Sequence, residues 1–167
     1  MEKEELVQLI TKKVLERLQE DSYSNNSQEQ EEKRNGSSLQ PVDVASYIDH
    51  TLLRPDATKQ EIADLCREAK QYRFYSVCVN SSWVEFCARE LRNTGVKVCS
   101  VVGFPLGAMD SRTKGAETRT AVENGADEID LVLHIGALKA GDLDYLEKDV
   151  RWVLRSCRQN TVTKVII

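Results

Sequence analysis

From residue 42 onward, short apolar segments alternate with segments that have the spacing of amphipathic helices, and this alternation limits the possible folds more than any other feature. Strands that alternate with helices form parallel sheets, because each helix returns the chain to the edge where the next strand begins. The sequence therefore predicts an α/β fold on a parallel sheet. Five strands are expected, at residues 47–51, 76–80, 96–104, 128–135 and 163–167.

Four helices are expected between these strands, over residues 58–72, 81–95, 112–124 and about 143–158. The first opens with Thr58 and Glu61 in the spacing of a capping box, and the second opens with Ser82 and Glu85 in the same spacing. Gly95 then suits the C-terminal end of the second helix.

Two architectures fit a parallel sheet of this kind, a doubly wound open sheet and a (β/α)8 barrel. A dinucleotide-binding fold needs a GxGxxG loop after its first strand, but here that strand runs into HTLLRPDATK, and no Walker motif is present. The barrel is favoured. With about five strands and four helices, it would be an incomplete one.

The chain changes character near residue 40. Residues 22–40 are almost wholly polar and of low complexity, which is typical of a flexible linker. We therefore expect three parts: an amphipathic helix at residues 1–20, a disordered polar linker at residues 21–41, and a barrel portion at residues 42–167.

The expected N-terminal helix has one apolar side, formed by Leu6, Val7, Ile10, Val14 and Leu18. A short helix on a flexible tether is marginal in water unless that side docks on something. It can pack on its own barrel or mediate oligomerisation, or it can bind a groove on a partner. It resembles the N-terminal encapsulation peptides that direct enzymes into bacterial microcompartment shells. Basic residues do not dominate its polar side, which argues against binding to a membrane surface.

Composition excludes several classes of protein. The net charge is −4 and no run of Lys and Arg is present, which argues against a nucleic-acid partner. No apolar stretch has the roughly 18 residues that a membrane span needs, and no signal peptide is recognisable. The cysteines form no CxxC pair, so we expect reduced thiols in a cytosolic protein and no structural zinc site. They are Cys66, Cys78, Cys87, Cys99 and Cys157.

Asp130 lies in the middle of the apolar segment GADEIDLVLHIG, where a carboxylate is costly unless it is paired or functional. Side chains of a strand alternate between its two faces. One face of residues 128–135 is uniformly apolar, and the other carries Glu128, Asp130, Val132 and His134.

If the apolar faces pack against the helices, the polar faces converge on the barrel interior. The set that meets there is Asp49, Thr51, Cys78, Asp130 and Lys164. Catalytic groups of such barrels lie at the C-terminal ends of the strands. An Asp–Lys pair can also be a structural ion pair, and Cys78 can be a small core residue. Together the set favours a polar reaction chamber, in which an amine near carboxylates suggests carbonyl chemistry.

Five blocks of sequence carry a family resemblance: YIDHTLLRPDAT, SVCVN, KVCSVVGFPLGA, ENGADEIDLVLHIGALKAGD and TKVII. In this order they closely resemble deoxyribose-phosphate aldolases, which are class I aldolases on a (β/α)8 barrel. The resemblance implies reversible cleavage of 2-deoxy-D-ribose 5-phosphate to acetaldehyde and D-glyceraldehyde 3-phosphate through a lysine Schiff base. It implies neither a metal nor a cofactor.

The resemblance also implies roles for the convergent residues. Asp130 matches the family's proton-relay aspartate, a general acid and base. Lys164 matches a lysine that lines the pocket, where its charge helps to lower the pKa of the nucleophilic lysine. Asp49 and Thr51 match positions near the substrate's hydroxyls or their water network, and Cys78 matches a pocket cysteine.

The family's Schiff-base lysine lies on the next strand, so we expect it beyond Ile167, together with the phosphate-binding loops. We therefore expect this polypeptide to be inactive alone. It would be a fragment of a longer aldolase, a product truncated by a frameshift or stop codon, or a half-barrel that completes itself by association.

Two other functions stay open: a non-catalytic cargo or binding module that acts through residues 1–20, and another class I aldolase for a different sugar phosphate. The expected partners are a sugar phosphate, acetaldehyde, a microcompartment shell protein that binds residues 1–20, and further copies of the full-length chain. The expected location is the cytoplasm or the inside of a bacterial microcompartment.

Overall fold

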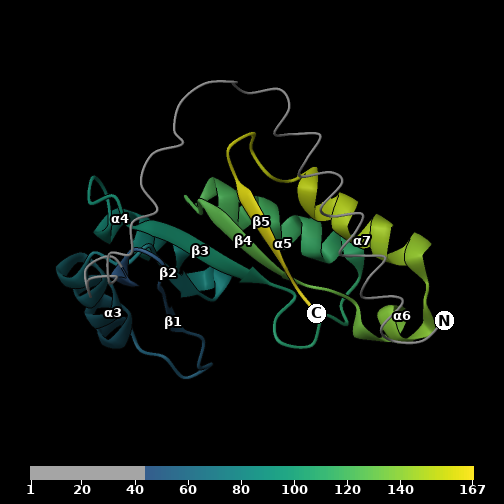
Figure 1. Ribbon diagram of the computed structural model, residues 1–167, viewed down its shortest axis with the longest axis horizontal. Coiled ribbons are helices and arrows are strands. Elements are labelled where there is room, and N and C mark those ends of the chain that lie inside the picture. Colours follow the sequence, from purple (N-terminus) through teal and green to yellow (C-terminus); the bar gives the residue numbers. More distant parts are fainter. Residues whose placement is uncertain (1–43) are drawn as a thin grey trace, which may run out of the picture. The chain divides into compact units, whose positions relative to one another are not determined.

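The computed structural model describes residues 44–167 (Figure 1). The helix expected at residues 1–20 and the linker expected at residues 21–41 lie outside the described residues. Within residues 44–167, no helix combines the length and the apolar character that crossing a membrane requires.

Five parallel strands form one sheet in the order of the sequence, β1-β2-β3-β4-β5. Each strand pairs with the one before it, so every connection is a crossover of the kind that the alternation predicts. The prediction of an α/β fold on a parallel sheet is confirmed. The strands are β1 Asp49–Leu52, β2 Ser76–Val79, β3 Lys97–Val102, β4 Glu128–Val132 and β5 Val162–Ile166.

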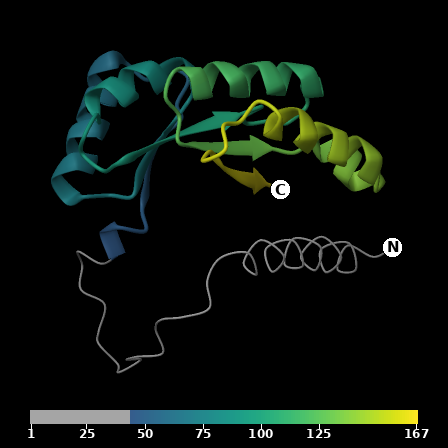
Figure 2. The same cartoon turned by 90° about the horizontal axis from the view of Figure 1, so that it is seen from above.

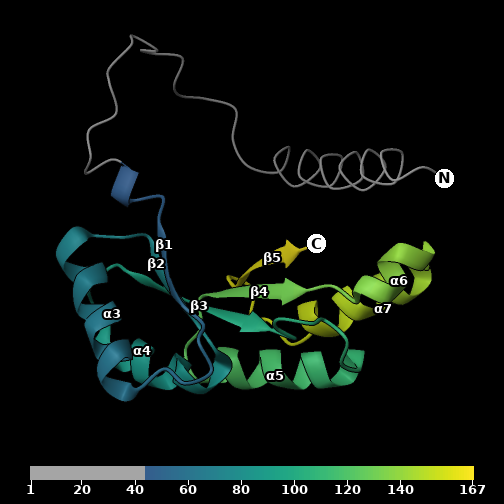
Figure 3. The ribbon, with the colours of Figure 1, turned by 90° about the horizontal axis from the view of Figure 1, so that it is seen from below.

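The helices of the described region pack against one face of this sheet. Figures 2 and 3 show α3, α4 and α5 together on one side of the strands. A doubly wound sheet carries helices on both faces, so cover on one face makes this sheet part of a barrel wall. The helical elements are α3 Lys59–Tyr72, the 3₁₀ turn η1 Ser81–Trp83, α4 Val84–Glu90, α5 Ser111–Glu123, α6 Ile135–Ala140 and α7 Leu143–Leu154.

The main core lies between the sheet and these helices. On this side, which we call the outer face of the sheet, the strands present buried apolar side chains: Val77, Val79, Val98, Val102, Ile129 and Leu131. Each such side chain contributes about 1.5–3 kcal/mol to folding. The apolar side chains on one face of β2, β3 and β4 thus pack against the helices, which leaves the other face of these strands free to carry polar side chains.

The sequence correctly predicts the start of α3 but not that of α4. Thr58 caps α3, since its Oγ1 accepts from Glu61 N at 3.3 Å and Glu61 Oε2 accepts from Thr58 N at 2.8 Å. The capping box expected at Ser82 and Glu85 is wrong: η1 precedes α4, and neither element has a side-chain cap. The helix also ends at Glu90 rather than at Gly95, because a turn follows in which Thr94 Oγ1 donates to Leu91 O at 2.7 Å.

The fourth strand is shorter than expected, and a helix follows it that the sequence pattern did not reveal. β4 ends at Val132, and His134 then caps α6, its Nδ1 accepting from Ala137 N at 3.1 Å. The sequence analysis predicted one strand over the whole apolar run to residue 135, because periodicity alone cannot distinguish a strand from a short helix that directly follows it. α7 ends at Leu154 rather than near residue 158, where a turn closed by Ser156 N donating to Val153 O (2.9 Å) replaces it.

Candidate active site

The face of the sheet turned away from the helices, which we call the inner face, gathers charged side chains around Lys164. The Nζ atom of Lys164 lies 3.0 Å from Asp49 Oδ2, 3.0 Å from Glu128 Oε2 and 3.2 Å from Asp130 Oδ1. These carboxylates come from β1 and β4, and the lysine comes from β5. We call these four residues the Lys164 cluster.

The contact between Asp49 and Lys164 shows that the sheet is curled. Neighbouring strands lie about 4.8 Å apart, so the first and last of five flat strands would be separated by roughly 19 Å. A lysine side chain is too short to cross that distance. The edge strands β1 and β5 therefore approach each other across the inner face, as the wall of a barrel requires.

Hydroxyl groups fix two of the three carboxylates. Ser76 Oγ donates to Asp49 Oδ1 at 2.6 Å, and Tyr75 Oη donates to Glu128 Oε1 at 2.6 Å. Burial alone would raise the pKa of Asp49, but the hydrogen bonds from Ser76 and Lys164 outweigh it and lower the pKa. Glu128 raises the pKa of Tyr75, because the phenol donates to its carboxylate.

Lys164 is held in its protonated form. Burial acts to lower its pKa, but hydrogen bonds to Asp49 and Glu128 and the charge of Asp130 raise the pKa above the ordinary lysine range. A protonated amine has no lone pair with which to attack a carbonyl group. Lys164 is therefore a fixed positive charge on the inner face rather than a nucleophile.

Asp130 is the carboxylate of the Lys164 cluster that keeps an oxygen without a hydrogen-bond partner in the described part of the chain. Its side chain is 17% exposed, between 4% for Glu128 and 36% for Asp49. Its Oδ2 accepts from Cys78 Sγ at 3.9 Å, while its Oδ1 faces Lys164 but accepts no well-formed hydrogen bond among the described residues. Asp130 thus has an oxygen with spare capacity to take or give a proton.

Four of the five residues that the sequence singled out are brought together: Asp49, Cys78, Asp130 and Lys164. Thr51 follows two positions after Asp49 on β1 and so shares its face, but its side chain is exposed and donates to Asp49 O at 2.9 Å.

Sequence reasoning placed Glu128 on the face of Asp130 but gave it no role, and it did not single out three other members of the inner face, Tyr75, Ser76 and Cys99. The alternation that places Cys78 there also places Cys99 and Val101 there, so a signal for Cys99 was present. Tyr75 precedes β2, where no strand alternation applies.

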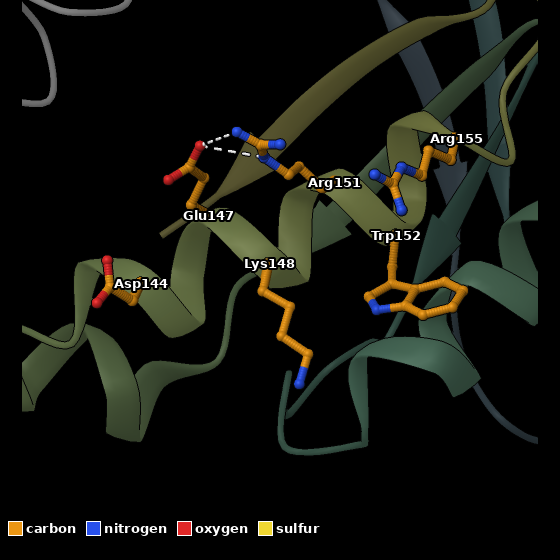
Figure 4. Close-up of a pocket in the computed structure, with 6 residues that line it drawn as sticks. All are labelled: Asp144, Glu147, Lys148, Arg151, Trp152 and Arg155. Atoms are coloured by element: carbon orange, nitrogen blue, oxygen red, sulfur yellow. Dashed lines mark hydrogen bonds and ion pairs between the residues drawn. The ribbon is translucent and has the colours of Figure 1, made fainter.

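A separate pocket of about 270 Å³ lies on α7, away from these residues. Figure 4 shows Glu147 and Arg151 paired along one side of the helix, with Lys148 and Trp152 directed together on another. Pairs at this spacing are ordinary features of exposed helices. The pocket offers no arrangement of acid, base and nucleophile, so the inner face is the candidate active site.

Comparison with known proteins identifies the relatives of this chain. Residues 43–167 match the model of a family described as DeoC/LacD family aldolase. A deoxyribose-phosphate aldolase from Bdellovibrio bacteriovorus is 54% identical over 126 residues, which are 75% of this chain and 57% of that protein. The chain thus spans about half the length of the curated relatives it matches.

Solved structures share the fold. A protein from Coccidioides immitis assigned as a deoxyribose-phosphate aldolase superposes with a TM-score of 0.73 at 34% identity, over 78% of this chain and 51% of that one. A deoxyribose phosphate aldolase from Aeropyrum pernix, described as tetrameric, gives a TM-score of 0.60 at 33% identity, over 75% and 53% of the two chains.

Proposed function

The chain belongs to the DeoC/LacD family of aldolases, and on that premise we propose that residues 42–167 supply the proton-relay part of a deoxyribose-phosphate aldolase. The reaction is the reversible cleavage of 2-deoxy-D-ribose 5-phosphate to acetaldehyde and D-glyceraldehyde 3-phosphate. It requires neither a metal nor a cofactor.

The observation that carries this proposal is the position of Asp130. A lysine amine adds to the substrate aldehyde, and loss of water gives an imine that withdraws electrons from the bond to be broken. Protons must leave the carbinolamine and the substrate hydroxyl and return to the enamine. One oxygen of Asp130 lies 3.2 Å from a lysine and the other faces a thiol, which supports Asp130 as the group that carries these protons.

The other residues support that step. Lys164 adds positive charge, which lowers the pKa of a neighbouring amine and keeps more of it unprotonated. Asp49 and Thr51 line the side of the chamber that would receive the substrate's hydroxyls, and Cys78 lines the side next to Asp130.

The imine-forming amine must come from another lysine. Lys164 is held protonated by its carboxylates, and Lys114 is 0% exposed and paired with Asp149 on the outer side of the sheet. We propose that the nucleophile belongs to the part of the family barrel that follows the matched region.

A trapping experiment tests this division of roles. The chain of residues 1–167, treated with acetaldehyde and borohydride, should gain no ethyl group by mass spectrometry. A chimera that joins residues 1–167 to the remaining part of the Bdellovibrio relative should be trapped and should cleave deoxyribose 5-phosphate.

Asp130→Asn in the chimera should lower kcat by about 10²–10⁴-fold, the usual contribution of a general acid or base. Asp64→Asn, on the exposed surface of α3, is the matched control and should have no effect. Trapping of the 1–167 chain that disappears in Lys164→Ala would refute the proposed nucleophile.

A different sugar-phosphate substrate is the alternative within this family. Profiling the chimera with acetaldehyde and other donors, and with phosphorylated and unphosphorylated acceptors, separates the two. Preference for a donor other than acetaldehyde would favour the alternative.

For residues 1–20 we propose a docking helix on the linker of residues 21–41, with a microcompartment shell protein as its partner. A fusion of residues 1–40 to a fluorescent protein should co-purify with shell proteins, and a Leu6→Glu, Ile10→Glu variant should not. If the fusion remains diffuse, the targeting role fails; if it co-purifies and the chimera is inactive, the non-catalytic cargo module is favoured.

We also propose that the full-length protein forms homo-oligomers, as the Aeropyrum relative does.

A further inference from the structure

Three consecutive strands place potential metal ligands together on the inner face. Cys78 on β2 and Cys99 on β3 are direct register partners, and Asp130 on β4 pairs with Val101, two positions after Cys99 on the same face. Their two sulfur atoms and a carboxylate oxygen all lie within 4.8 Å of one another. We propose that these three residues form a binding site for a thiol-seeking divalent cation, with Zn²⁺ as the natural occupant.

The distances suit such an ion. Zinc binds sulfur at about 2.3 Å and carboxylate oxygen at about 2.0 Å, so tetrahedral ligand atoms lie roughly 3.5–3.8 Å apart. Cys78 Sγ and Asp130 Oδ2 are 3.9 Å apart. The other pairs of ligand atoms lie within 4.8 Å of one another, so closing the site needs movements of up to about 1 Å, which side-chain rotation can supply.

The surroundings hold the ligands in place. Cys78 is 4% exposed and Cys99 is 0% exposed, and both lie on strands in the middle of the sheet. Ligands on regular elements are positioned more accurately than ligands on loops. Three protein ligands also leave the fourth position of a tetrahedral ion open to water or another small ligand.

Lys164 orients the carboxylate ligand. It lies 3.2 Å from Asp130 Oδ1, which turns Oδ2 toward the sulfur atoms, and such outer partners commonly fix metal-binding side chains. An unpaired ammonium would repel a cation, but Asp49 and Glu128 each place an oxygen 3.0 Å from its Nζ and neutralise it.

The donor set selects the kind of metal. Two thiolates favour Zn²⁺ and Cd²⁺ over Mg²⁺ and Ca²⁺, which prefer oxygen ligands. Binding releases the thiol protons to solvent, and the two thiolates then neutralise the double charge of the ion. The spacing of the cysteines gave no sign of this site, because residues 78 and 99 meet only through strand pairing.

Bound zinc would occupy Asp130 and so inhibit proton transfer; this consequence rests on the proposed function, whereas binding itself does not. The ion is therefore an inhibitor of the site and not a requirement for its reaction.

Cobalt titration of the full chain, kept reduced with a phosphine, tests binding without any need for turnover. One Co²⁺ per chain should give a near-ultraviolet thiolate-to-cobalt absorption band, and Zn²⁺ should displace it. Cys78→Ser and Cys99→Ser should each weaken binding by more than about tenfold, since the loss of even an outer partner of a ligand weakens affinity roughly 10- to 100-fold.

Cys66 and Cys87 provide a matched control, because they are also 0% exposed and hydrogen-bonded to each other. Cys87→Ser should leave the cobalt band unchanged. Asp130→Asn keeps every thiol and should still weaken binding about tenfold or more, which decides the matter if a serine variant misfolds by circular dichroism. An absent band, a band that survives in both Cys78→Ser and Cys99→Ser, or unchanged affinity in Asp130→Asn would overturn the proposal.

Discussion

Two lysines, one on each side of the sheet, form ion pairs of opposite character. On the outer side Lys114 is 0% exposed; its Nζ lies 2.5 Å from Asp149 Oδ2 and donates to Val132 O at 2.9 Å. On the inner side Lys164 is 38% exposed and faces Asp49, Glu128 and Asp130. The first lysine has one carboxylate and no access to solvent, while the second has three carboxylates and an open side.

The Lys114–Asp149 pair therefore has a structural role, whereas the Lys164 cluster is suited to chemistry. A closed pair of one cation and one anion neutralises itself and holds α5 against α7, which carry its two members. A cluster with more carboxylates than its lysine can neutralise leaves an acidic group able to exchange protons with a ligand. Burial of a charged residue therefore does not identify it as functional. A cluster in which carboxylates outnumber cations, and which solvent can reach, is the better indication.

The largest effect expected is on stability, in Lys114→Met. Removing the amine leaves Asp149 buried without its counter-ion, which costs about 3–5 kcal/mol. Lys164→Met should cost less than Lys114→Met, since Lys164 and Asp49 are each more than a third exposed. Urea unfolding followed by circular dichroism measures both, and equal losses would remove the distinction between the two lysines.

The double variant Lys114→Met, Asp149→Leu sharpens that result. Replacing both members of a buried pair by apolar groups is often neutral or stabilising, so most of the loss in Lys114→Met should be recovered. The same urea titration applies. If the double variant is as unstable as the single one, packing around Lys114 rather than its charge explains the loss.

A smaller effect is expected on catalysis in the chimera carrying Lys164→Met. Removing a neighbouring cation should raise the pKa of the nucleophilic amine by about one unit, which lowers the rate at neutral pH about tenfold. The limb of the pH–rate profile that reports this amine should therefore move to higher pH. A uniform loss of rate with no shift of the profile would assign Lys164 a structural role instead.

The smallest effect is expected from Ser76→Ala on acid stability. Because the pKa of Asp49 is lower in the folded chain than in the unfolded one, its stabilising contribution is present above about pH 3.9 and is lost as the pH falls further. Without the Ser76 hydrogen bond this pKa should rise toward its ordinary value, and stability should depend less on pH between about 5 and 3. Ser100→Ala, at a buried serine that donates to Val101 O, is the control and should leave that dependence unchanged.

The period-two pattern of the strands was enough to predict which face Asp130, Lys164 and Cys78 share. It could not predict that Asp49 reaches Lys164, because that contact depends on how far the sheet curls, and alternation carries no information about curvature. The family resemblance supplied the barrel and hence the expectation that the strands surround one axis.

Lys114 and Asp149 were missed for a different reason. Each is a charged residue in an amphipathic helix, where a solvent-exposed position is the usual expectation. Lys114 and Asp149 are 35 positions apart in the chain. They neutralise each other only because α5 and α7 pack side by side. Tertiary pairing of this kind leaves no local trace in the sequence.

The bond between Asp49 and Lys164 joins positions separated by 115 residues, the longest span of any side-chain hydrogen bond described in this chain. Helices and adjacent strand pairs can assemble one after another as the polypeptide leaves the ribosome. The carboxylate on the first strand must wait for its counter-ion until the fifth strand has been synthesised. The Lys164 cluster is consequently the last part of this region to form. A nascent chain halted before residue 164 would already have most of its apolar core but not the ion pairs of this cluster.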